Sequence, residues 1–106
     1  MELSNQPWSE QFRIVAKQWV DADASASLLE DTKSAVLAER MQSHSLLAIN
    51  KAEMLVKASP EWRDHVGKIV AARKLANLLK VQMEYLRMKS SEGQSAEATR
   101  RAEMRL

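Results

Sequence analysis

The sequence predicts an all-α protein, built from two long helices that are joined by a loop and a short helix. Only two glycines and two prolines occur in 106 residues, so turn and strand signals are nearly absent. Hydrophobic residues make up 45% of the chain, which is enough for a core. They recur at steps of three and four, which are typical of amphipathic helices. We expect one helical domain over residues 1–106, a helical hairpin or bundle that dimerisation completes.

The first long helix is expected over residues 7–43, after a lead-in at residues 1–6. Pro7 suits a first helical position, because the N–H that it lacks is not needed there. Residues 21–27 are small and acidic, a composition that either lets another helix approach closely or marks a bend. The segment is therefore one helix, or two segments bent near residues 22–27. Its apolar seam consists of Trp8, Phe12, Val15, Trp19, Ala22, Ala26 and Leu29.

A loop at residues 42–47 and a short helix at about residues 51–58 are expected to follow. Asn50 and Glu53 have the spacing of a capping box, in which two side chains satisfy amide groups of the first turn. The short helix is expected to bury apolar side chains on one face. These are Ala52, Met54 and Leu55, with Val56 as a further candidate.

The second long helix is expected over residues 59–89. Ser59 is a good cap, Pro60 suits the first helical position, and Glu61 places negative charge near the positive end of the helix dipole. No proline follows. The run Ser-Ser-Glu-Gly-Gln-Ser after Lys89 weakens the helix. Residues 90–106 are therefore expected to form a polar tail that frays when it is alone.

Two apolar lines run along this second helix. The main seam consists of Ile69, Ala72, Ala76, Leu79, Met83 and Leu86, and the second line of Ala71, Leu75, Leu78 and Tyr85. Together they cover about half of the helix circumference, which is more than one neighbouring helix buries. This width predicts a two-fold dimer that forms a four-helix core. The residues expected to build the core and the oligomer interface are Trp8, Phe12, Trp19, Leu75, Leu79, Met83 and Leu86.

Charge is unevenly distributed along the chain. Residues 1–49 carry four Lys or Arg against seven Asp or Glu, a net of −3, and residues 50–106 carry twelve against seven, a net of +5. One interpretation is that the two halves attract each other, within a chain or between subunits. The other is that the basic half faces an anionic partner such as nucleic acid. The candidate phosphate-binding residues, three of them recurring every seven positions, are Arg73, Lys80, Arg87, Lys89, Arg100, Arg101 and Arg105.

The search for catalytic chemistry is negative. His44 and His65 lie 21 residues apart, and neither has a metal-ligand partner three or four residues away. The chain has no cysteine, no phosphate-binding glycine loop and no nucleophile elbow. We therefore expect no enzyme activity, no catalytic or metal-binding residue, no cofactor and no small-molecule substrate. Without a signal peptide, a membrane span or cysteines, a cytoplasmic protein is expected.

Several stretches resemble small helical proteins found in tailed phages and prophages. They are LLEDTKSAVLAERM, NKAE with VKASPEWRDHV, and ARKLANLLKVQMEYLRMK with SAEATRRAEMRL. The resemblance covers residues 28–106, contains no catalytic motif and carries over no functional residue. It implies a phage-derived intracellular protein, an accessory to phage DNA replication or recombination. We expect a non-enzymatic, homo-oligomeric adaptor whose partner is a protein or DNA; the alternative is non-sequence-specific nucleic-acid binding by the basic half.

Overall fold

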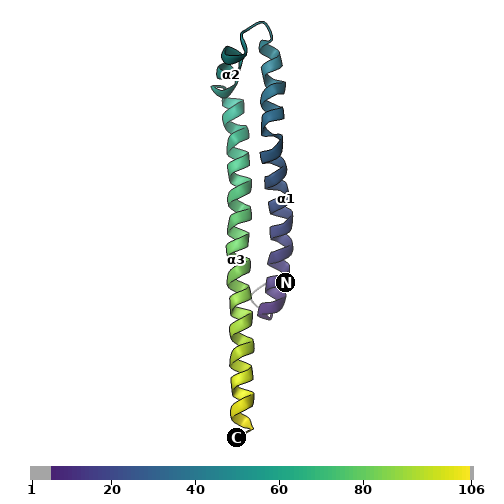
Figure 1. The fold of residues 1–106 in the computed structure, drawn as a ribbon, viewed down its shortest axis with the longest axis vertical. Helices are drawn as coiled ribbons and strands as arrows, with labels where there is room; N and C mark the ends of the chain where they lie inside the picture. The colour runs from purple at the N-terminus through teal and green to yellow at the C-terminus, as the bar shows by residue number, and fades with distance from the viewer. Residues whose placement is uncertain (1–5, 106) are drawn as a thin grey trace. The chain divides into compact units, whose positions relative to one another are not determined.

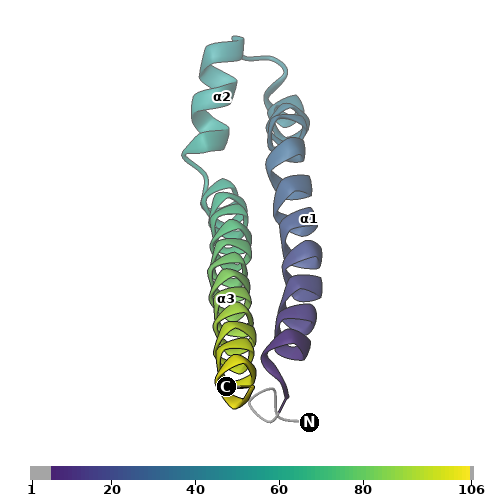
Figure 2. The ribbon, with the colours of Figure 1, turned by 60° about the horizontal axis from the view of Figure 1, so that its bottom comes forward.

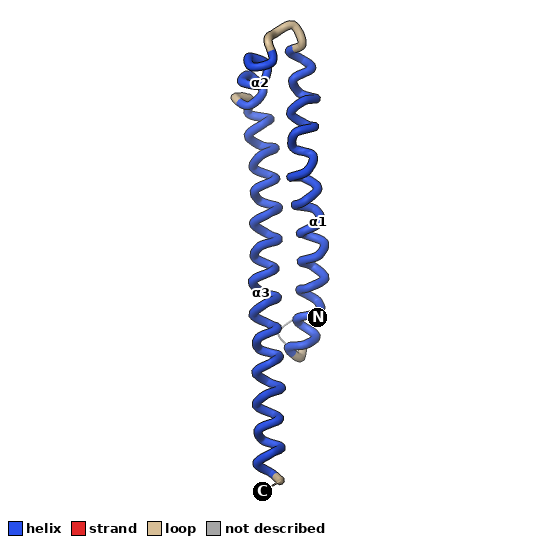
Figure 3. Tube along the Cα trace, viewed as in Figure 1, coloured by secondary structure: helices blue, strands red, loops and turns tan. Residues whose placement is uncertain are grey.

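A computed structural model describes residues 6–105 and shows an all-α chain (Figures 1 and 3). The elements are α1 (Trp8–Met41), the 3₁₀ helix η2 (Gln42–His44), α2 (Ile49–Lys57) and α3 (Pro60–Met104). The predicted order of a long helix, a loop, a short helix and a second long helix is confirmed. The predicted lead-in lies outside the described residues except for Gln6, and so does Leu106 at the other end.

The first helix is one uninterrupted element. α1 runs for 34 residues from Trp8 to Met41, so the small-residue run at 21–27 introduces no break. Ala26 within that run is fully buried, with 0% of its surface exposed. Of the alternatives left open by the sequence, one helix or two segments, the structure shows one helix.

The start of α2 differs from the sequence prediction. The helix begins at Ile49, and Ala48 occupies the cap position without any side-chain capping bond. The Ala48 carbonyl accepts from the backbone amides of Lys51 and Ala52, each at 3.0 Å. The predicted capping box of Asn50 and Glu53 is therefore wrong, because Asn50 already lies inside the first turn. Ala52 and Val56 are buried as predicted, whereas Met54 and Leu55 are exposed.

The start of α3 is confirmed in detail. The Ser59 hydroxyl accepts from the Trp62 backbone amide at 3.2 Å and donates to the Val56 carbonyl at 2.6 Å. Pro60 is the first helical residue. The far end differs, because α3 continues past Lys89 through Gly93 to Met104. One glycine costs a helix only about 1 kcal/mol, which does not end a helix of good helix-forming residues.

Contacts divide the chain into two compact units, which we describe separately. The turn unit comprises residues 22–75. In it, the second part of α1 and the first part of α3 run antiparallel, with α2 at the end where the chain reverses (Figure 2). The turn unit is thus the predicted helical hairpin. Its buried apolar residues are Ala26, Ala52, Val56, Trp62 and Ile69.

The terminal unit comprises the described residues up to 21 together with those from 76 onward. Here the first part of α1 lies beside α3 in both ribbon views (Figures 1 and 2). Its buried side chains are Gln11, Val15, Ala76 and Leu86. The side-chain amide of Gln11 donates to the Gln6 carbonyl at 2.7 Å. This bond satisfies one polar group of a buried side chain. Residues 91–105, the last part of α3 and Arg105 after it, are all exposed.

Candidate interaction surfaces

One arginine connects the two helices of the turn unit. Arg73 on α3 forms a two-pronged pair with Glu30 on α1, from Nε to Oε2 at 2.9 Å and from Nη2 to Oε1 at 2.7 Å. Its Nη1 donates to Asp23 Oδ1 at 2.7 Å, and Nη2 also donates to the Ser27 hydroxyl at 3.2 Å. Bidentate guanidinium–carboxylate pairs fix geometry as well as charge. We call Arg73, Asp23, Ser27 and Glu30 the Arg73 cluster.

Within the Arg73 cluster, the hydrogen bonds favour the charged forms of Glu30 and Arg73. The hydrogen bonds from Arg73 lower the pKa of Glu30 below its ordinary value of 4.5, against a smaller opposing effect of desolvation. The hydrogen bonds to Glu30 and then Asp23 raise the pKa of Arg73 further. All three side chains keep 30–40% of their surface exposed, so solvent screens the attraction. The acidic first half and the basic second half of the sequence therefore attract each other within the turn unit.

The inward side of α3 matches the predicted main seam. Ile69, Ala76 and Leu86 are buried, and Ala72, Leu79 and Met83 are half-buried. Trp62, which the sequence prediction of the seam did not include, is also buried. It lies seven residues before Ile69 and fourteen before Ala76, so extending the heptad spacing backward finds it.

The opposite side of α3 carries apolar side chains that stay about half exposed in the described chain. Leu78, Val81, Tyr85 and Met88 are between 48% and 64% exposed. They recur at steps of three, four and three, so they form one continuous row on the helix surface. All four belong to the terminal unit. We call this row the outer strip. Leu78 and Tyr85 belong to the predicted second line, and the exposed Ala71 and Leu75 of that line lie in the turn unit.

The residues predicted to build the core and the oligomer interface fall into two groups. Leu86 is buried, and Phe12, Trp19, Leu79 and Met83 are half-buried, so these five contribute to packing within the chain. Trp8 and Leu75 are 45% and 53% exposed. Neither is a core residue of the chain by itself, and their place in an oligomer interface stays a prediction.

A second exposed apolar group lies in the turn unit, at the loop before α2. Leu46 is 100% exposed and Ile49 is 75% exposed. Met54 and Leu55 on α2 are also exposed. The loop itself is held by backbone bonds, including one from the Leu47 amide to the His44 carbonyl at 3.0 Å. This group adds apolar surface that is available to a partner, but its flanking charges are mixed.

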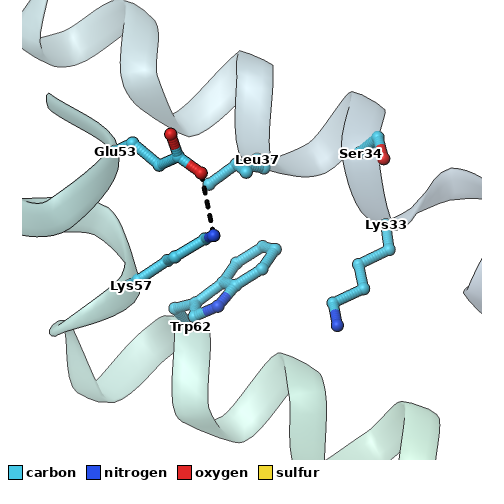
Figure 4. A pocket seen from close by; sticks show the side chains of 6 residues that line it. All are labelled: Lys33, Ser34, Leu37, Glu53, Lys57 and Trp62. Carbon is cyan, nitrogen blue, oxygen red and sulfur yellow. Dashed lines mark ion pairs between the residues drawn. The ribbon is translucent and has the colours of Figure 1, made fainter. Parts of the chain in front are cut away.

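A small hollow of the turn unit lies above Trp62 (Figure 4). Glu53 and Lys57 of α2 form an ion pair at 2.8 Å on one side, and Lys33 of α1 lies on the other. Ser34 and Leu37 complete the lining. The carboxylate already neutralises one of the two lysines, so the hollow is not an anion site of concentrated charge.

His65 lies beside the indole of Trp62, with 5.5 Å between the ring centroids. Its Nε2 is buried and has no hydrogen-bond partner among the described residues. The imidazole as a whole is only half-buried, so the ring packs on the indole at the edge of the turn unit. His44 lies in η2, and His65 lies in α3. Within residues 6–105 no cluster of three His, Cys, Asp or Glu side chains is arranged to hold a metal ion.

The predicted phosphate-binding residues do not form one free basic surface. Arg73 is engaged by two carboxylates. Lys89 lies 3.4 Å from Glu92 and 5.6 Å from the centroid of the Tyr85 ring. Arg101 lies 3.4 Å from Glu97. The remaining predicted residues, all exposed, are Lys80, Arg87, Arg100 and Arg105.

No helix in the described part of the chain combines the length and apolar character that crossing a membrane requires. Comparisons of the chain with protein-family models, with curated proteins and with solved structures find no match. The interpretation of function therefore depends on the surfaces described above.

Proposed function

We propose that this chain is a non-enzymatic helical interaction protein that acts as a homo-oligomeric adaptor or accessory factor in the cytoplasm, of the kind found in phages and prophages. The observation that carries the proposal is the outer strip, a row of four exposed apolar side chains on one face of α3. Contiguous exposed apolar surface on a small protein marks a place where another molecule binds.

The absence of cysteine and the resemblance to phage proteins support the cytoplasmic and phage parts of the proposal. The exposed apolar residues near α2 add a second surface, distinct in sequence from the outer strip. A chain with two such surfaces is suited to an adaptor, because one surface serves self-association and the other remains for a partner. Binding of nucleic acid is the weaker candidate, because Arg73, the first residue of the predicted basic ridge, is occupied by Asp23 and Glu30.

Sedimentation velocity over a wide range of protein concentration tests the proposal. We expect the sedimentation coefficient to rise with concentration through the micromolar range, because the exposed apolar area is modest and area of this size supports reversible association. A monomer at every concentration would contradict self-association.

A further inference from the structure

The outer strip is an exposed apolar face of α3 within the terminal unit. We propose that it packs against the outer strip of a second copy of this chain, with the two α3 helices antiparallel about a two-fold axis. The inference rests on the proposed self-association and adds the surface, the orientation and the residues that set them.

The position of the outer strip leaves it free for such a partner. At ~100° per residue, Leu78, Val81, Tyr85 and Met88 lie on the side of α3 roughly opposite Ala76, Met83 and Leu86. Those last three side chains are buried or half-buried along the inward seam. A second α3 helix can therefore lie along the outer strip without displacing the packing that the chain already has.

The spacing of the outer strip fits an antiparallel pair. Leu78 and Met88 are symmetrical about position 83, and so are Val81 and Tyr85. In an antiparallel arrangement centred there, Leu78 faces Met88 of the partner subunit and Val81 faces Tyr85 of the partner subunit. Each contact occurs twice, as a two-fold interface requires. The larger side chain of each pair meets a smaller or more flexible one, which favours interdigitation.

The charges that bound the outer strip decide the orientation. Along α3, Lys74 lies four residues before Leu78 and Glu92 lies four residues after Met88. An antiparallel pair centred on position 83 places Lys74 opposite Glu92 of the partner subunit, at both ends. A parallel pair in register places Lys74 opposite Lys74 of the partner subunit, and the two Glu92 side chains opposite each other. Like charges at seam positions oppose association. Glu84, at the solvated edge of the outer strip, acts in the opposite sense but more weakly, because solvent screens an exposed pair. The antiparallel pair is therefore favoured.

Substitution of one flanking residue should change the dimer dissociation constant in opposite directions in the two orientations. Glu84 is one residue from the midpoint, at the edge of the outer strip. The antiparallel pair brings it near Glu84 of the partner subunit, whereas the parallel pair brings it near Lys89 of the partner subunit. Glu84→Gln should therefore tighten an antiparallel dimer and weaken a parallel one.

The first experiment locates the surface with a matched pair of variants. Val81→Gln places an amide in the proposed interface, and Val20→Gln makes the same change at an exposed valine of α1 in the same unit; these valines are 64% and 56% exposed. Both variants should keep the wild-type circular dichroism. We expect Val81→Gln to raise the dissociation constant at least about tenfold and Val20→Gln to leave it unchanged, because a buried amide without a partner opposes association. Equal effects of the two variants, or no effect of Val81→Gln on a dimer that persists, would overturn the assignment.

The second experiment exchanges the bounding charges. Lys74→Glu and Glu92→Lys should each weaken the dimer several-fold, and the double variant should restore wild-type affinity. In a parallel dimer the double variant should not restore the affinity, because residue 74 would still face the same charge at residue 74 of the partner subunit, and residue 92 the same charge at residue 92.

The third experiment measures the orientation directly. The chain has no cysteine, so Arg100→Cys accepts a single spin label on an exposed position of α3. Arg100 lies seventeen residues beyond position 83, so the two labels of an antiparallel dimer should be separated by about 50 Å. A separation below about 20 Å would show parallel helices, since neighbouring helix axes are only about 8–10 Å apart. A wild-type monomer contradicts the proposed function, whereas an oligomer with a different label distance contradicts only the antiparallel pairing.

Discussion

At the scale of single residues, Arg73 forms the ion pairs that join α1 and α3 within the turn unit. It bonds Asp23, Ser27 and Glu30 across the two helices, while the other ion pairs among residues 6–105 join residues only three or four positions apart. Local pairs add little to stability, because they form within a helix that is already present. The Arg73 cluster instead fixes how α1 and α3 are placed along each other within this unit.

Glu30→Gln is expected to lower the free energy of unfolding at neutral pH more than Glu10→Gln. Glu10 is the matched control, since it is paired with Arg13 on the same helix and its pKa is lowered by the same kind of hydrogen bond. The folded-state pKa of Glu30 lies below 4.5. Its contribution is therefore present above that value and is lost as the pH falls through the folded-state pKa.

Urea unfolding followed by circular dichroism measures this difference. At a pH below the lowered folded-state pKa of Glu30, wild-type protein and Glu30→Gln should have nearly the same unfolding free energy. A difference that persists unchanged in acid would show that Glu30 acts through packing and not through its charge.

The sequence identified Arg73 as a residue of interest but not its partners. Its seven-residue spacing with Lys80 and Arg87 predicts a shared flank of a helix, and this is a local property. The carboxylates that Arg73 contacts depend on how α1 is aligned along α3. This alignment is set by the connection between the two helices, which consists of η2, the loop and α2. The general attraction between the acidic and basic halves was predictable, because it needs only the net charges.

At the scale of elements, α3 was predictable where local signals are strong. The Ser-Pro-Glu start and the seam of Ile69, Ala76 and Leu86 follow from capping and periodicity. The end of α3 was not predictable in the same way, because Gly93 and its polar neighbours are neutral to weak signals. The second apolar line was visible in the sequence, and the width of the apolar face predicted that one neighbouring helix would not bury all of it. Which residues stay exposed depends on the packing of α1 against α3, which only the structure shows.

The two glycines of α3 give a test of how stability is distributed along the helix. A methyl group added at Gly67 or Gly93 meets no atom within 4 Å. Both changes to alanine should favour the helix by about 0.5–1 kcal/mol locally, by reducing the freedom of the unfolded chain. Gly67→Ala should raise the free energy of global unfolding by this amount, because it lies among packed residues of the turn unit.

Gly93→Ala should act differently, because residues 91–105 are all exposed. We expect it to increase helix content in circular dichroism and to slow amide exchange in that segment, with little change in global unfolding. A full stabilisation of global unfolding by Gly93→Ala would show that the last part of α3 is packed in solution, for example against a second copy.

At the scale of the whole molecule, the question is whether the basic half keeps enough unpaired positive charge to bind an anionic partner. Its net charge of +5 is computed from the sequence, before any pairing. In the described chain, Arg73, Lys89 and Arg101 each have a carboxylate within 4 Å. Glu92 and Glu97 belong to the basic half and are already counted in its net charge, so only Asp23 and Glu30 of the acidic half reduce the excess, from +5 to +3. Among the described residues, the unpaired cations Lys80, Arg87, Arg100 and Arg105 are spread along the chain from residue 80 to residue 105.

We expect no nucleic-acid binding at physiological salt, measured by the fluorescence anisotropy of labelled single- and double-stranded DNA. Scattered surface lysines and arginines release few counterions, so any association at low salt should be weak and lost as salt is added. Micromolar binding at physiological salt would contradict this expectation.

If such binding is found, the double variant Lys80→Gln with Arg87→Gln identifies the surface. Neutralising two phosphate contacts should reduce the slope of log affinity against log salt by about 2. An unchanged slope would place the contacts elsewhere, on Arg100 and Arg105 near the end of α3. A reduced slope would identify the flank of α3 that carries Lys80 and Arg87 as the nucleic-acid surface.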